Sequence, residues 1–160
     1  MGKGESPLNG QSKSADGGDA IAWRVVALFG VLNLFRGSIH TFLPDGGAGV
    51  IAGFDLSHSR QTIVFLFAVM GIEQLSLGVV DLIVAFRARW LAVAMLWFHT
   101  LEQTAAEIVF VFYKPAPGRP PGIIGLPLVV VLLWLVLGWI YWRRSASARE
   151  TANAFIASTK

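Results

Sequence analysis

The 160-residue chain contains no cysteine, and only 14% of its residues are charged. Without cysteine, the chain forms no disulfide, offers no thiolate nucleophile and ligates no iron–sulfur cluster. The sequence also lacks a phosphate-binding loop, a nucleophile elbow, an HExxH zinc motif and a GxGxxG dinucleotide motif. Enzymes that carry these motifs are therefore excluded, and any redox role would require a borrowed cofactor.

Hydrophobic residues are abundant instead, at 54% of the chain, and the mean hydropathy is +0.60. This composition is too apolar for an ordinary soluble domain. A helix needs about 20 residues to cross the hydrocarbon core of a bilayer. Four apolar stretches meet that length, at residues 21–43, 61–86, 90–113 and 123–142. The predicted fold class is all-α, a polytopic membrane protein with a four-transmembrane-helix bundle.

The segments outside these stretches are polar. Residues 1–20 are rich in Gly, Ser, Asp and Lys and predict a disordered tail, whereas residues 143–160 form a basic tail. Because the basic residues lie beside membrane segments, we expect lipid headgroups, not nucleic acid, as the anionic partner. Most of them fall on the side that holds both ends of the chain, which predicts an integral plasma (inner) membrane protein with both termini cytoplasmic.

Glycine spacing predicts how the first two stretches pack. Gly30 and Gly37 are seven residues apart, as are Gly71 and Gly78, so each pair lies on one helix face. Small residues on a face let two helix backbones approach closely, and we expect these two spans to touch there. The short connection at 87–89 predicts that the second and third spans form an antiparallel hairpin.

Ionisable side chains inside the spans are the candidate site. Charged groups in lipid are costly, so they should face one another in an intramembrane polar cluster that could bind a ligand. The candidates are Arg36, His40, Glu73, His99, Glu102 and Glu107. Asp81 lies nearer the inner end of its span, where we expect it to pair with Arg24 or Arg87.

The cluster admits other interpretations. Arg36 with Glu102 or Glu73 is equally explained as a buried ion pair that fixes helix register. His40 is typical of an interfacial histidine with satisfied hydrogen bonds. His99 and Glu102, completed by Glu73 and His40, are metal-ligand candidates, but di-iron bundles use two Glu-xx-His motifs and only one reversed copy occurs here. We therefore predict no metal.

One stretch resembles a known family. The pattern VMGIEQLSLGVVDLIVAFRARWLAVAML, together with Gly30 and the Asn/Arg/Gly residues after it, is similar to the DoxX-like small membrane proteins over about residues 21–113. The resemblance implies a four-helix membrane bundle and, for named members of the family, an association with quinone-linked oxidation of sulfur compounds. Glu73 matches the glutamate of the family's second helix.

These observations favour a binding role over an enzymatic one. We expect a lipid-binding or quinone-binding protein, or an accessory subunit of a membrane complex. Its expected partners are membrane lipid and either further copies of the chain, in a homo-oligomer, or the other subunits of a larger membrane complex. The alternatives are a quinone-linked membrane oxidoreductase component, as the resemblance implies, and a small proton or solute transporter. The only cofactor that the sequence suggests is a bound quinone or lipid.

Overall fold

The computed structural model describes residues 8–114 and 121–159. Every regular element in these two ranges is helical, as the sequence predicts. In chain order the helices are α1 (Leu8–Phe42), α2 (Arg60–Arg87), the 3-10 turn η1 (Arg89–Leu91), α3 (Ala92–Ile108), the π-helical turn η2 (Val109–Tyr113) and α4 (Pro121–Ser158).

Three segments are long and apolar enough to cross a membrane. They are Ala20–Phe42 of α1, Arg60–Arg87 of α2 and Ile123–Ser158 of α4. The expected third span does not form one long helix, because η1 and η2 flank α3 and leave it 17 residues. Its polar side chains also make it less apolar than its neighbours. The structure therefore supports a membrane protein with three candidate spans and a shorter helix between the second and the third.

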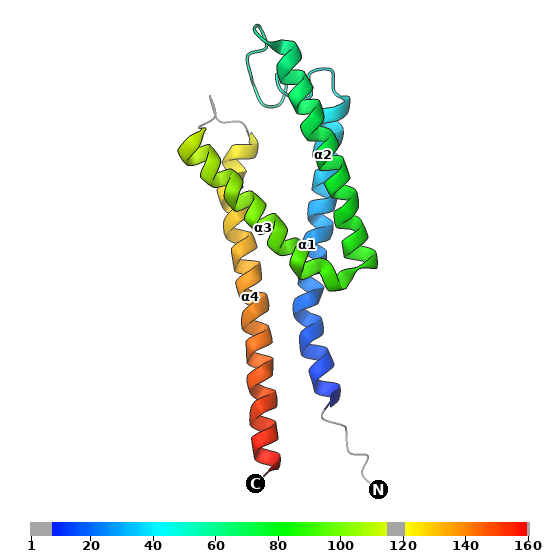
Figure 1. Cartoon of the computed structure of the whole chain (residues 1–160), viewed down its shortest axis with the longest axis vertical. Coiled ribbons are helices and arrows are strands. Elements are labelled where there is room, and N and C mark those ends of the chain that lie inside the picture. Colours follow the sequence, from blue (N-terminus) through cyan, green and yellow to red (C-terminus); the bar gives the residue numbers. More distant parts are fainter. Residues whose placement is uncertain (1–7, 115–120, 160) are drawn as a thin grey trace.

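The helix α1 occupies the centre of the fold. It packs most extensively against α2, which runs antiparallel beside it, and also contacts α3 and α4 (Figure 1). The helix α3 leaves the end of α2, crosses α1 obliquely and reaches α4. It has few contacts with α2, so the predicted hairpin of the second and third spans is wrong as a packed unit. A short turn fixes where two helices meet, but it does not keep them parallel.

The glycine faces of α1 and α2 meet as predicted. A Cβ atom added to Gly37 would lie 2.8 Å from the carbonyl oxygen of Gly71, and one added to Gly78 would lie 2.9 Å from the carbonyl oxygen of Gly30. Backbone therefore faces backbone at two levels, two turns apart. This close contact sets the register of the two helices.

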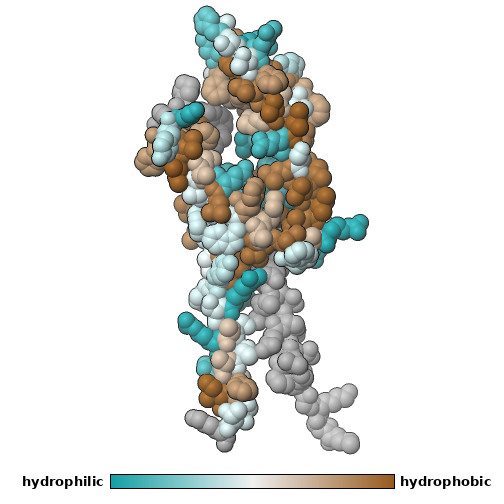
Figure 2. Space-filling model, viewed as in Figure 1, coloured by the Kyte–Doolittle hydropathy of each residue, from teal (hydrophilic) through white to brown (hydrophobic). Residues whose placement is uncertain are grey.

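The N-terminal polar segment differs from the prediction. Residues 1–7 lie outside the described part of the chain, but α1 begins at Leu8, so residues 8–20 are helical where we expected disorder. Adding residues to an existing helix costs much less than nucleating one, and the apolar span supplies the nucleus. The helix α4 likewise continues to Ser158. Figure 2 shows hydrophobic surface over the region where the helices pack, whereas the far end of α4 carries a mixture of hydrophilic and hydrophobic side chains.

The apolar core lies where α1, α3 and α4 converge. Its fully buried members include Val26 from α1, Leu96 from α3, and Leu137 and Ile140 from α4. This core holds the middle of α3 against the two long helices. It thereby positions the polar side chains of α3 that follow Leu96.

We expect Gly71→Ala to lower the free energy of unfolding by about 1–3 kcal/mol, because overpacking forces a tight interface apart. The added Cβ would lie 2.8 Å from the backbone nitrogen of Thr41 and 2.9 Å from the carbonyl oxygen of Gly37. Denaturant titration in detergent measures this change. Gly138→Ala is the matched control, because no atom lies within 4 Å of its added Cβ. Equal stability of both variants would contradict the contact.

Candidate functional site

A buried ion pair between α2 and α3 forms the centre of the candidate site. Nε2 of His99 lies 2.8 Å from Oδ1 of Asp81. Asp81 is fully buried and His99 is 1% exposed. A buried carboxylate needs a cation or several hydrogen-bond donors, and here the imidazole supplies the nearest donor. The expected pairing of Asp81 with Arg24 or Arg87 is therefore wrong.

A second carboxylate lies on the other side of the imidazole. Nδ1 of His99 lies 3.4 Å from Oε2 of Glu102, one turn further along α3. A neutral imidazole donates from only one nitrogen, so both contacts are hydrogen bonds only if the ring is an imidazolium or if one carboxyl group is protonated. Glu102 is 43% exposed, whereas Asp81 is buried. The contacts therefore run from a buried carboxylate through the imidazole to a partly exposed carboxylate.

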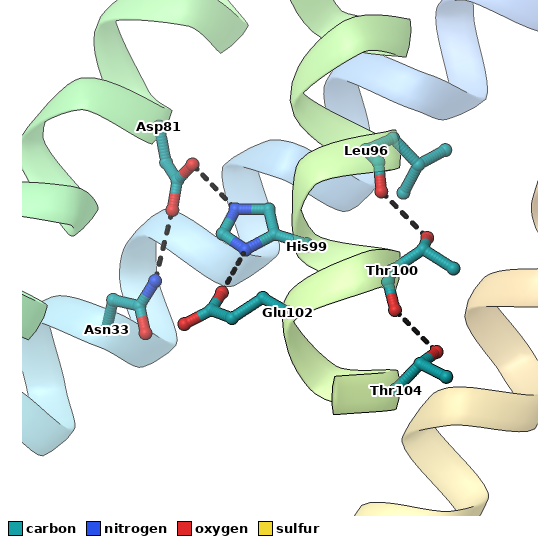
Figure 3. A network of polar contacts seen from close by, with 7 residues as sticks. All are labelled: Asn33, Asp81, Leu96, His99, Thr100, Glu102 and Thr104. Atoms are coloured by element: carbon teal, nitrogen blue, oxygen red, sulfur yellow. Dashed lines mark hydrogen bonds and ion pairs between the residues drawn. The ribbon is translucent and has the colours of Figure 1, made fainter. Parts of the chain in front are cut away.

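Two residues of α1 complete the surroundings of the imidazole. Nδ2 of Asn33 donates a hydrogen bond of 3.1 Å to Oδ2 of Asp81, so each oxygen of that carboxylate has a partner. The ring of Phe29 stacks on His99, with ring centroids 4.5 Å apart. Figure 3 shows the contacts that link Asn33, Asp81, His99 and Glu102, which we call the His99 network. Three helices therefore supply its members.

The opposite face of α3 holds the helix against α4. Oγ1 of Thr104 donates to the carbonyl oxygen of Thr100, and Nε1 of Trp134 donates to Oγ1 of Thr104 over 3.2 Å (Figure 3 draws the first contact). Near the start of α3, Nε1 of Trp97 donates to the hydroxyl of Tyr141. These bonds fix the rotation of α3 about its axis, and with it the direction in which His99 points.

The structure brings together only two of the six predicted site residues, His99 and Glu102. Arg36 and Glu73 are exposed on α1 and α2, Glu107 is half-buried on α3, and none of the three has an ion pair with any residue in the described ranges. The prediction of a single six-residue cluster, and that of a buried pair between Arg36 and Glu102 or Glu73, are therefore wrong. The helix α3 diverges from the α1–α2 pair, so these side chains point into different surroundings.

His40 has a local role. Its Nδ1 lies 2.7 Å from the carbonyl oxygen of Gly46, in the loop that follows α1, and its ring meets Phe67 edge to face. The hydrogen bond agrees with the interpretation of His40 as a histidine satisfied by its own surroundings, and its position at an interface stays a prediction. His40 is far along α1 from Asn33 and takes no part in the His99 network.

No set of three or more His, Asp or Glu side chains in the described residues is arranged to hold a metal ion. At His99 the reason is visible, because both ring nitrogens already face carboxylate oxygens. The candidates His40, Glu73, His99 and Glu102 therefore do not form a metal site together in these ranges.

Comparisons with known proteins give no further guide. No family model matches the chain, and neither the curated proteins nor the solved structures include a match. The geometry of the His99 network is therefore the basis for a functional proposal.

We expect Asp81→Ala to lower the free energy of unfolding by about 1–3 kcal/mol, because it leaves a buried imidazole donor without a partner. Glu102→Ala should have a clearly smaller effect, because Glu102 is partly exposed and its contact with His99 is longer. Tryptophan fluorescence during denaturation in detergent measures both. Similar losses in the two variants would show that Asp81 and Glu102 hold His99 equally.

Proposed function

We propose that this protein is a small integral membrane subunit that binds the head of a membrane-soluble quinone at the His99 network. The observation that carries the proposal is the position of His99 between a buried carboxylate, Asp81, and an exposed one, Glu102. Such an arrangement holds a proton inside an apolar bundle and presents it at one accessible oxygen. That property suits a ligand whose polar head gains and loses protons.

A quinone gains two electrons and two protons on reduction to a quinol. In this proposal the imidazolium of His99 passes its proton through Glu102 to one quinone oxygen and becomes a neutral imidazole, and the second proton reaches the other oxygen with the electrons from the redox partner. Asp81 stabilises the imidazolium and holds the ring in position, while Asn33 orients Asp81. The electrons come from a redox partner in the same membrane complex, so the chain acts as a quinone-binding accessory subunit.

Two further features support this role. Residues 21–113 resemble the DoxX-like proteins, which implies a four-helix membrane bundle and an association with quinone-linked oxidation. Among the described residues the chain of side-chain hydrogen bonds ends at Asn33, so it has one open end, at Glu102. A proton transporter needs access from both sides of the membrane, and the one-ended network favours binding over transport.

The orientation in the membrane is also a proposal. The described start of α1 and the end of α4 lie at the same end of the molecule (Figure 1). Arg143 and Arg149 of α4 lie toward that end. By the positive-inside rule this end faces the cytoplasm, with α3 completing a four-helix bundle in the plasma membrane.

The unpaired charges on the spans support membership of a larger assembly. Arg36 and Glu73 are exposed on α1 and α2, in segments apolar enough to cross the membrane. A charge at the centre of a lipid-facing helix costs at least about 2.5–3.5 kcal/mol. A neighbouring subunit, either a second copy or another membrane protein, removes that cost by supplying charges of opposite sign.

Quinone binding is tested with a short-chain benzoquinone added to the protein in detergent, where quenching of tryptophan fluorescence reports binding. We expect Glu102→Gln to weaken binding at least about tenfold, because it removes the exposed end of the proton chain. Glu107→Gln is the matched control, since Glu107 lies on the same helix and has no ion pair with the described residues. Equal weakening in both variants would place the ligand elsewhere.

Assembly is tested by native mass spectrometry of the gently extracted protein. We expect Glu73→Leu or Arg36→Leu to release the chain from its complex, because each removes one member of an intersubunit ion pair. Arg24→Leu is the control, since Arg24 lies toward the inner end of α1 and its guanidinium lies over the ring of Trp23. A wild-type chain that is monomeric before any substitution would contradict the assembly.

A further inference from the structure

A pocket of about 540 Å³ is formed by the loop that connects α1 and α2, at the other end of this helix pair. Its lining combines aliphatic side chains with one acidic and one basic residue. The residues are Leu43, Pro44, Asp45, Gly49, Val50, Leu56 and Arg60. This volume is within the range of small-molecule sites.

Asp45 fixes the conformation of the loop that lines this pocket. Its Oδ1 accepts the backbone N–H of Gly47, and its Oδ2 accepts those of Gly49 and Val50. Gly46 and Gly47 have positive φ angles of 62° and 78°, which let the chain turn tightly around the carboxylate. The bonds from Val50, Gly47 and Gly49 lower the pKa of Asp45, so the pocket contains a fixed negative charge.

Arg60 supplies the opposite charge. Arg60 is the first residue of α2, and its side chain is exposed. Its guanidinium has no hydrogen bond or ion pair within the described part of the chain. The carboxylate of Asp45 lines the same pocket but is already bound to backbone N–H groups, and the two do not form a salt bridge. An unpaired guanidinium with five donors in a planar fork suits the oxygens of a phosphate group.

The pocket lies at the ends of the first two candidate membrane spans. Leu43 follows the last residue of α1, and Arg60 is the first residue of α2. Val50 is 86% exposed and Ile51 is 48% exposed, so the loop presents apolar side chains outward next to the charged pair. Apolar side chains beside a cation are the chemistry expected at the boundary between headgroups and acyl chains.

We infer that this pocket binds the headgroup of a zwitterionic glycerophospholipid. The phosphate lies on the guanidinium of Arg60, and the glycerol and first acyl carbons lie against Leu43, Val50 and Leu56. The ammonium group lies toward Asp45, whose negative charge disfavours an anionic headgroup. Arg60 and Asp81 are about 30 Å apart along α2, at a rise of about 1.5 Å per residue. The lipid site is therefore independent of the proposed quinone site.

Native mass spectrometry of the full chain, equilibrated in detergent with one lipid at a time, tests the inference. The probes are phosphatidylethanolamine, phosphatidylglycerol and diacylglycerol with identical acyl chains. We expect wild-type protein to retain one phosphatidylethanolamine and Arg60→Gln to retain it at least fivefold less. Lys114→Gln is the matched control, because Lys114 is an exposed cation that follows η2 and is not part of the pocket.

A second variant tests the site in case Arg60→Gln alters the fold of the loop. A circular dichroism spectrum would not detect such a change, because it reports mainly on the helices. Val50→Ser keeps the backbone N–H that binds Asp45 and alters only an exposed side chain, and it should also reduce lipid retention. Unchanged retention by Arg60→Gln, or equal retention of diacylglycerol, would overturn the site. Preference for phosphatidylglycerol would overturn the role of Asp45. Displacement of the lipid by inorganic phosphate would overturn the lipid site, because it would show a site for a free anion. Glu102→Gln should retain the lipid, so this result is separable from quinone binding.

Discussion

The hydrogen bond between His99 and Asp81 is the interaction on which the placement of α3 against α1 and α2 depends. It joins α2 to α3 at a point where neither partner contacts solvent, and a buried carboxylate without such a partner is strongly unfavourable. The glycine contacts between α1 and α2 bring Asn33 within reach of the same carboxylate, so its second oxygen also has a donor. Close packing of these two backbones therefore completes the hydrogen bonds of the buried carboxylate.

The oblique course of α3 follows from its two sets of contacts. On one face His99 holds the middle of α3 to α1 and α2, and on another face Thr104 and Trp134 hold it to α4. These anchors lie on different sides of the bundle, so α3 crosses between them and does not run alongside α2 (Figure 1). Its crossing leaves Glu102 partly exposed beside the buried pair of Asp81 and His99.

Much of the helix content and the α1–α2 packing is predictable from the sequence, because apolar length and seven-residue glycine spacing act locally. The partner of Asp81 is not predictable from depth alone. Counting residues from each end treats every helix as straight and perpendicular to the membrane, which assigns Asp81 to the inner surface and His99 to the midplane. The short turn at 87–89 is a better guide to the partner of Asp81. It keeps the end of α2 close to the start of α3, whatever the depth of each residue in the membrane.

The ionisable side chains of the helices fall into two groups. Some have hydrogen-bond partners within the chain, and others have none among the described residues. Asp81 and His99 are enclosed by their own fold, whereas Arg36 and Glu73 stand on outward faces of α1 and α2. Both groups consist of the same residue types in the sequence. Only the arrangement of the helices shows which side chains form an internal hydrogen-bond network and which are exposed without a partner. Lipid cannot solvate these two charges cheaply. In the proposed assembly a neighbouring subunit supplies the opposite charges that this chain does not, so the constraint that fixes the buried pair within the chain would also act between chains.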